Sequence, residues 1–356
     1  MFRRNKGPVE NKLVAGHMRG FFRNHSMGSR PHTEERCVGN YAAYLWDHRS
    51  HELKDAKRFT RGHHYVGLCT DATGMDDLTK RATPVSDTLL LSHEGGQFVR
   101  ASTLVLQDCS VVEPPFSAGG GIAYGTVGFV CPSPGRLSRW IHASEPLLKA
   151  GLAWYLPNYR TVTDGTQRRS EAYERANNRH FDYLVRDRRL IDASGAHPIK
   201  GRLVRPILEI DLPFIDGNDL RGFSDITIGE FDSYRKFREY LRQSFLAIDD
   251  GLNAVQSEQA LQKVASEIRG HIYEMRGQMK TVARRRAVTV TGASLGVVSA
   301  SLAAVYGPAL EEVIKVLGPS GKIWGAVEAN STNNPRKLRE DSWYYVWALH
   351  QHAHHL

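Results

Sequence analysis

From Pro84 onward, apolar residues fall in short blocks rather than in long periodic stretches. Three blocks bounded by Gly or Pro predict β-strands: 88–91, 98–106 and 122–130. Residues 137–150 carry apolar positions at helical spacing, and Gly151 fits the left-handed position that closes a helix. The apolar run 152–156 then predicts a return as a strand.

Two longer segments complete this region. Residues 169–191 are rich in charge and carry an apolar stripe at helical spacing, which predicts a long helix. Residues 203–212 predict another strand, interrupted by Pro206. Alternating strands and helices are typical of an α/β or α+β domain, which we place at 84–215.

The second half of the chain shows only helical periodicity. Thr227 and Glu230 have the spacing of a capping box, which predicts a helix start. Apolar positions then repeat in steps of three and four, lose phase after Val255 and resume over 261–282. The phase break predicts an antiparallel helical hairpin, and one interrupted coiled coil is the alternative.

The end of the chain is aromatic. Residues 343–349 predict a terminal helix that closes over the helical bundle, and the basic residues before them make a membrane interface the alternative. The predicted fold class is therefore α+β, with a mixed α/β N-terminal domain followed by an all-helical C-terminal domain over 224–356.

Residues 1–83 are polar and basic. The chain has a net charge of +9, and residues 1–81 hold 15 Lys and Arg against 9 Asp and Glu. We predict a weakly structured arm with one helix near 37–46. A basic arm that contains aromatic residues suits nucleic acid or an anionic membrane surface, and a solvated tail is the alternative. None of the four cysteines forms a C-x-x-C pair, which favours reduced thiols in a cytoplasm.

An uncharged segment at 287–310 is long enough to cross a bilayer. It follows a basic triplet that would stay on the cytoplasmic side: Arg284, Arg285 and Arg286. Gly292 and Gly296 form the close-approach pattern of membrane helix pairs. Two interpretations remain, a buried helix of a cytoplasmic protein and a single helix in the inner (cytoplasmic) membrane.

Candidate chemistry is sparse. Arg175 and His180 have an R-x4-H spacing, similar to that of HEPN-type ribonucleases, which would place a general base beside a phosphate-binding group. Surface residues are the simpler interpretation. Glu209 and Asp211 near Lys200 distantly resemble the acidic pair of a metal-dependent nuclease.

The glycine and histidine clusters give no stronger indication of a nucleotide or metal site. The glycine-rich stretch 117–128 lacks the Lys of a P-loop, so we predict a loop that enters a strand. Histidines crowd the C-terminus at 350–355, where fixed coordination geometry is rare, and His93 stands beside Glu94 upstream. The sequence predicts no cofactor and no metal site.

The second half has a recognisable order of elements. After a Pro-bounded linker come Phe237-Arg238-x-x-Leu241-Arg242, an amphipathic helix, the basic triplet, the small-residue helix and Tyr345-Val346-Trp347-x-Leu349. This order resembles a loose group of uncharacterised bacterial proteins of actinomycete type, with an α/β N-terminal part and a helical C-terminal part. The resemblance covers about 137–350 and carries no activity or functional residue. It implies a bacterial intracellular setting and a link to defence or mobile elements.

These observations predict a non-catalytic intracellular protein that binds a protein partner or itself through its helical region. A membrane-associated effector that uses 287–310 is the first alternative. A metal-dependent or HEPN-like nuclease is the second.

Overall fold

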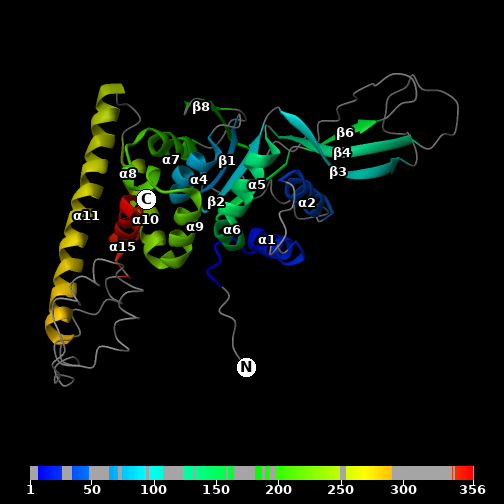
Figure 1. The fold of residues 1–356 in the computed structure, drawn as a ribbon. Helices are drawn as coiled ribbons and strands as arrows, with labels where there is room; N and C mark the ends of the chain where they lie inside the picture. Colours follow the sequence, from blue (N-terminus) through cyan, green and yellow to red (C-terminus); the bar gives the residue numbers. More distant parts are fainter. Residues whose placement is uncertain are drawn as a thin grey trace.

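The computed structural model confirms the α+β fold class (Figure 1). It describes residues 7–25, 34–47, 64–70, 74–93, 96–106, 123–131, 133–157, 159–163, 181–186, 189–192, 198–248, 254–290, 339 and 341–355.

A five-stranded sheet forms the centre of the fold. Its strands lie in the order β5 (Ala153–Tyr155), β2 (Thr88–His93), β1 (Tyr65–Thr70), β7 (Tyr183–Arg186) and β8 (Arg189–Asp192). The first four are parallel, and β8 runs antiparallel to β7. Numbered along the chain, the strands lie in the order 3-2-1-4-5. This is the order of doubly wound sheets, whose ligands bind outside the carboxyl ends of the strands.

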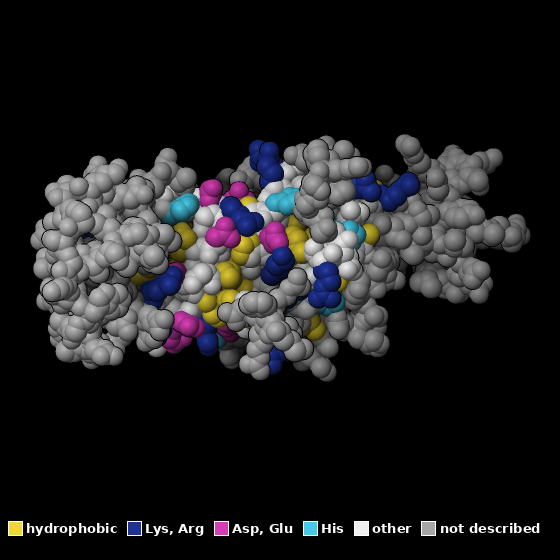
Figure 2. Space-filling model, turned by 60° about the horizontal axis from the view of Figure 1, so that its bottom comes forward, with side chains coloured by type: hydrophobic (Ala, Val, Ile, Leu, Met, Phe, Trp, Pro, Cys, Tyr) yellow, Lys and Arg dark blue, Asp and Glu magenta, His cyan; other side chains and the backbone are white. Residues whose placement is uncertain are grey.

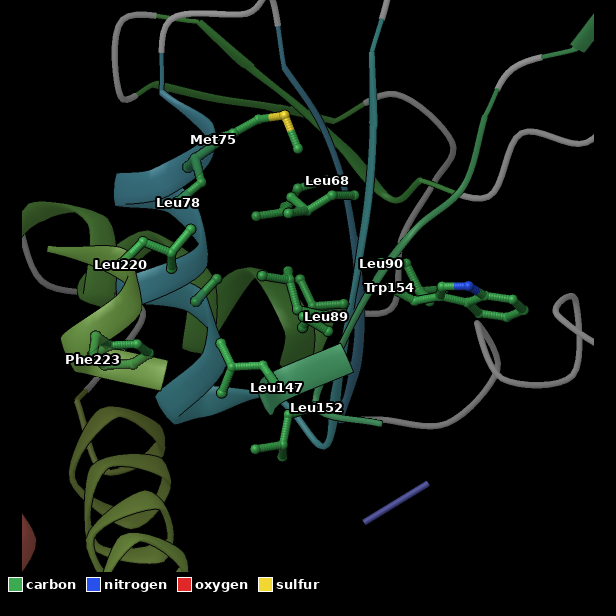
Figure 3. Packing of buried hydrophobic residues seen from close by; sticks show 14 of the residues in the cluster. Leu68, Met75, Leu78, Leu89, Leu90, Leu147, Leu152, Trp154, Leu220 and Phe223 are labelled. Carbon is green, nitrogen blue, oxygen red and sulfur yellow. The ribbon is translucent and has the colours of Figure 1, made fainter. Parts of the chain in front are cut away.

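Helices pack on both faces of this sheet, so β1, β2 and β5 are almost wholly buried, whereas the edge strand β8 is exposed or half-buried. The helix α4 (Met75–Ala82) connects β1 to β2 through the 3-10 turn η1 (Thr83–Val85). Figure 3 shows Leu68 and Leu89 pointing toward α4, whereas Leu90 and Trp154 lie on the other side of the strands. On that other side, Trp154 stacks on His17 with ring centroids 5.8 Å apart.

Four helices complete the layers around the sheet. The helices α1 (Lys12–Asn24) and α2 (Glu34–Asp47) bury their apolar faces in the core. The predicted helix at 37–46 is therefore confirmed. The predicted helix at 137–150 is present as two pieces, α5 (Pro134–Ala143) and α6 (Glu145–Ala150).

Gly151 ends α6 in the left-handed conformation, with φ of 77°, as the sequence predicts. A Cβ atom at this position would lie 2.4 Å from the backbone oxygen of Asn11, the residue that caps α1. We expect Gly151→Ala to destabilise the fold by about 1–3 kcal/mol, because strained backbone adds to the clash. Denaturant unfolding measures this change. Gly16→Ala, inside α1 with open space around it, should be neutral or stabilising.

A smaller antiparallel sheet of β3 (Gln97–Leu106), β4 (Ala123–Cys131) and β6 (Tyr159–Thr163) extends to the right in Figure 1. The strands predicted at 88–91, 98–106, 122–130 and 152–156 are confirmed. The end of the glycine-rich stretch lies in β4, as predicted, and residues 117–122 lie outside the described part of the chain.

The C-terminal half adds helices α7 (Pro198–Glu209), α8 (Pro213–Asp216), α9 (Leu220–Gly229), α10 (Phe231–Leu246), α11 (Ala254–Val290) and α15 (Ser342–His355). In Figure 1, α15 lies between α10 and α11 and packs against both. The predicted closing helix at the aromatic end is therefore confirmed. The predicted α10–α11 hairpin is not confirmed, since both helices pack mainly against α15.

Three local predictions are wrong. The apolar run predicts a strand over 203–212, but α7 covers most of this segment, because Leu203, Val204, Ile207 and Leu208 bury one helical face. Within the predicted helix 169–191, the described residues from Tyr183 onward form the β7–β8 hairpin instead. Thr227 caps no helix, since it lies inside α9 and its hydroxyl donates to the carbonyl of Phe223.

The uncharged segment 287–310 begins inside α11, which continues through Arg284, Arg285 and Arg286 to Val290. Residues 291–310, with Gly292 and Gly296, lie outside the described residues. Among the helices that the structure does describe, none is both long enough and apolar enough to cross a membrane.

Candidate functional site

A cleft of about 550 Å³ opens at the carboxyl edge of the central sheet. Its wall includes His93, the last residue of β2, and the first turn of α4, which follows β1. The helices α5 and α9 contribute their N-terminal turns to the other walls. This is the edge where doubly wound sheets bind their ligands.

The α4 wall is acidic. Asp76 and Asp77 occupy the first turn of α4, where the helix dipole favours negative charge. Burial raises the pKa of Asp76 above its usual range, as does the neighbouring Asp77 carboxylate, while Lys80 and Arg139 oppose the shift. The Nζ atom of Lys80 lies 3.2 Å from Asp77 and donates to the carbonyl of Asn218 at 2.8 Å. The charge of Lys80 is thus already engaged by protein atoms.

The α5 wall is basic. Ser133 caps α5 by accepting a hydrogen bond from the backbone nitrogen of Arg136, and Pro134 follows at the first helical position. Arg136 and Arg139 are three residues apart, so they share one helical face, and both side chains are exposed. Neither forms an ion pair with another residue of the described part of the chain.

The α9 wall is nearly neutral. Asp219 caps α9 by accepting from the backbone nitrogen of Gly222 at 2.6 Å. Arg221 pairs with Asp225 at 2.9 Å and lies 3.9 Å from Glu145. The charge of Arg221 is therefore compensated locally, whereas Arg136 and Arg139 on the α5 wall form no ion pair among the described residues, although Arg139 interacts with Asp76 across the cleft.

His93 is 3% exposed, and its Nδ1 atom lies 3.2 Å from the hydroxyl of Tyr155 in the adjacent strand β5. Burial raises the pKa of Tyr155 well above its ordinary value, so this hydroxyl stays a neutral phenol. The hydrogen bond fixes the orientation of the imidazole ring. A histidine held in this way can exchange a proton with a bound molecule.

A second His-containing pair is chemically inert. The Sγ atom of Cys37 lies 3.8 Å from Nε2 of His142, at the contact between α2 and α5. A nucleophilic cysteine must be a thiolate. Burial raises the pKa of the Cys37 thiol, and burial also lowers the pKa of His142. Both groups are therefore neutral, and the pair contributes to packing.

Among the residues that the sequence singled out, Glu209 and Asp211 are described and both line a second cleft between α7 and α11, which Lys200 does not line. Arg175 and His180 lie outside the described residues. Glu209 ends α7 and Asp211 follows it, so the strand that would align these two carboxylates is absent from this position. Lys200 instead contacts Asp182. Within the described ranges, no group of three His, Cys, Asp or Glu side chains is placed to hold a metal ion.

The sequence pattern does not reveal the cleft residues, because the two helices that carry them give weak local signals. The sequence gives α4 eight residues with only three apolar ones, too few for periodicity to reveal it. The apolar spacing alone predicts a start for this helix at Leu137, one residue after Arg136 and three after Pro134. The pattern Ser133-Pro134 is a helix start signal that would have brought Arg136 and Arg139 into one turn.

The chain matches no family model, no curated protein and no solved structure. The resemblance to bacterial proteins of actinomycete type therefore stays a prediction.

Proposed function

We propose that the chain binds a small organic anion in the cleft between α4, α5 and α9. The observation that carries this proposal is the pair Arg136 and Arg139, two exposed guanidinium groups without an ion pair among the described residues. They stand on the first two turns of a helix, where the dipole adds further positive potential. Guanidinium groups bind phosphate and carboxylate through paired hydrogen bonds.

The acidic α4 wall of the cleft further restricts which ligands would fit. Asp76 and Asp77 present carboxyl groups, which accept hydrogen bonds from hydroxyl or amino groups. A ligand that spans the cleft would therefore carry an anionic group at one end and such donors at the other. Phosphorylated sugars and nucleotides have this chemistry. The volume of about 550 Å³ lies within the usual range of small-molecule sites.

The molecular surface gives less support to a nucleic-acid duplex as the ligand. Among the described side chains on the face in Figure 2, acidic and basic groups are mixed around an apolar band and form no continuous basic stripe. Duplex binding depends on clustered positive charge that neutralises several phosphates. Binding of a protein partner, or self-association, through the helical region stays a prediction from the sequence.

Calorimetric titration tests the proposal with four probes: inorganic sulfate, AMP, glucose 6-phosphate and citrate. We expect at least one organic probe to bind, and the double variant Arg136→Gln/Arg139→Gln to weaken it about 100-fold. Two charge-assisted hydrogen bonds of about 1.5 kcal/mol each give this factor. Arg235→Gln removes a similarly exposed guanidinium from α10, outside the cleft, and should bind as the parent protein does.

Two results would contradict the proposal. The first is equal affinity of the parent protein and the double variant for every probe that binds. The second is the absence of binding by all four probes at about 10 mM, a concentration that reveals even weak anion sites.

A further inference from the structure

Lys80 connects two walls of the anion cleft. Its side chain starts on α4, where its ammonium lies 3.2 Å from the carboxylate of Asp77. The same ammonium donates to the carbonyls of Asn218 at 2.8 Å and Asp216 at 3.3 Å, in the turn that leads into α9. An ammonium has three N–H donors, and these three contacts account for all of them. Lys80 therefore holds the α4 wall and the start of the α9 wall together.

Asn218 is in turn held by the C-terminal helix α15. It is 2% exposed, and its amide nitrogen donates to the carbonyls of Phe214 at 2.6 Å and Leu349 at 3.0 Å. Its amide oxygen is thus the atom that lies 2.6 Å from Nδ1 of His352. Since this oxygen only accepts, Nδ1 of His352 carries a proton and donates it. The last turns of α15 therefore fix the residue whose backbone carbonyl binds Lys80.

The same histidine also packs against the first turn of α9. A Cβ atom at Gly222 would lie 2.3 Å from Cε1 of His352, so the imidazole ring lies directly on the helix backbone there. This turn contains Leu220 and Arg221 and begins at the cap Asp219, and all three residues line the cleft. The helix α15 contacts α8 as well as α9. It therefore supports the α9 wall without lining the cleft itself.

We propose that α15 fixes the separation of the α4 and α9 walls, with His352 and Asn218 as positioning residues for anion binding. This inference rests on the proposed function and adds its regulation, because the cleft has its binding geometry only while α15 is docked. Linked equilibria are reciprocal, so an anion in the cleft also stabilises the docked helix. The same helix packs against α11, and it thereby connects the ligand site with the helical region of the chain.

Calorimetric titration with AMP, glucose 6-phosphate and citrate tests this role. His352→Leu removes the Nδ1 donor and keeps a side chain of similar size. We expect it to weaken probe binding about tenfold, within the usual range of coupling between linked sites. His352→Asn, whose amide nitrogen can take the place of Nδ1, should recover most of the affinity. Gln351→Leu, which lies about 100° of helix rotation away, should bind as the parent protein does.

A second variant leaves every hydrogen-bonding side chain in place. In Gly222→Ala the added methyl group displaces the ring of His352, and we expect weaker probe binding, as in His352→Leu. Circular dichroism checks that each variant is folded. If His352→Leu does not fold, the comparison of Gly222→Ala with the parent protein decides.

Hydrogen–deuterium exchange gives a readout that a purely structural role of His352 would not change. A bound probe should slow exchange of the α15 amides in the parent protein and in Gln351→Leu. The same probe, at a concentration that saturates each protein, should slow exchange much less in Gly222→Ala, where α15 and the cleft are uncoupled.

Equal affinity of the parent protein, His352→Leu and Gly222→Ala for every probe that binds overturns this inference and leaves the proposed function standing. Exchange of α15 that does not respond to a bound probe does the same. If Arg136→Gln/Arg139→Gln binds every probe as tightly as the parent protein, or if no probe binds at all, the proposed function fails and the inference fails with it.

Discussion

Lys200→Met is expected to lower the free energy of unfolding by about 3–5 kcal/mol, the cost of breaking a buried ion pair from one side. Lys200 is 1% exposed, and its Nζ atom lies 2.8 and 3.0 Å from the two carboxylate oxygens of Asp182. Asp182 also accepts a hydrogen bond from the backbone nitrogen of Gly67 at 2.8 Å. The pair therefore connects α7 to the sheet, between β1 and β7.

The cost arises because the carboxylate of Asp182 would stay buried without its counter-charge. Guanidinium-induced unfolding, followed by circular dichroism, measures the loss. Lys149→Met is the matched control, since Lys149 forms a partly exposed pair with Glu145 within α6 and should cost less than about 1 kcal/mol. A loss of the same small size in Lys200→Met would contradict the argument.

A double variant distinguishes a lost counter-charge from lost packing. In Lys200→Met/Asp182→Asn the neutral amide oxygen still accepts from Gly67, while the uncompensated charge is gone. We expect this variant to recover a large part of the stability lost in the single variant. Equal stability of the single and double variants would assign the loss to packing of the lysine side chain instead.

This pair also shows what the sequence could not reveal. The sequence pattern associates Lys200 with Glu209 and Asp211, which are near in sequence, and it predicts a helix around Asp182, the actual partner of Lys200. Residues 183–192 carry four leucine, isoleucine or valine side chains among charged ones, and this composition suits both a helix stripe and a short hairpin. Pairing of β7 with β1 decides between the two, and such long-range pairing leaves no local signal.

Features with a local cause were predictable. Gly151 is confirmed in the left-handed conformation because a residue without Cβ tolerates it best. Strands β2, β3 and β4 are confirmed because their apolar blocks are bounded by turn residues. The terminal aromatic helix is confirmed as a closing element of the bundle.

The cleft is formed by elements that the topology of the sheet brings together. The sequence pattern alone does not predict that these elements are neighbours. Asp76 and His93 lie on the neighbouring elements α4 and β2, whereas Arg136 on α5 is separated from both along the chain by β3 and β4. Their meeting follows from β1 and β2 being parallel neighbours, so that both carboxyl ends open at one edge. The residues that start α5 can be recognised in the sequence, but the order of the strands in the sheet cannot be derived from it.

Arg81→Met is the second large effect, and we expect it to destabilise the fold by about 3–4 kcal/mol. The buried guanidinium of Arg81 donates from Nη1 to the carbonyls of Ile207 and Ile210 at 3.0 and 2.8 Å. Its Nε and Nη2 atoms bind the two carboxylate oxygens of Asp216. One side chain thus satisfies carbonyls at the C-terminal end of α7 and fixes α8 beside it.

Substitution by methionine leaves the buried carbonyls of Ile207 and Ile210 without their donor, and each unsatisfied buried group costs about 1–3 kcal/mol. The carboxylate of Asp216 is 34% exposed, so water replaces part of its lost contact. Arg81→Lys should recover less than half of the loss, because one ammonium cannot reach both the carboxylate and the helix end with the planar fork of arginine. The comparison with Arg235→Met, an exposed residue 3.9 Å from Glu10, isolates burial as the cause. Equal unfolding free energies for Arg81→Met and Arg235→Met would show that the α7 carbonyls find other partners.

Because Arg81 adjoins Lys80, whose ammonium binds the carbonyl of Asn218 beside the cleft, the same variant should also weaken anion binding. That loss would connect the stability of the α7–α8 corner to the shape of the cleft.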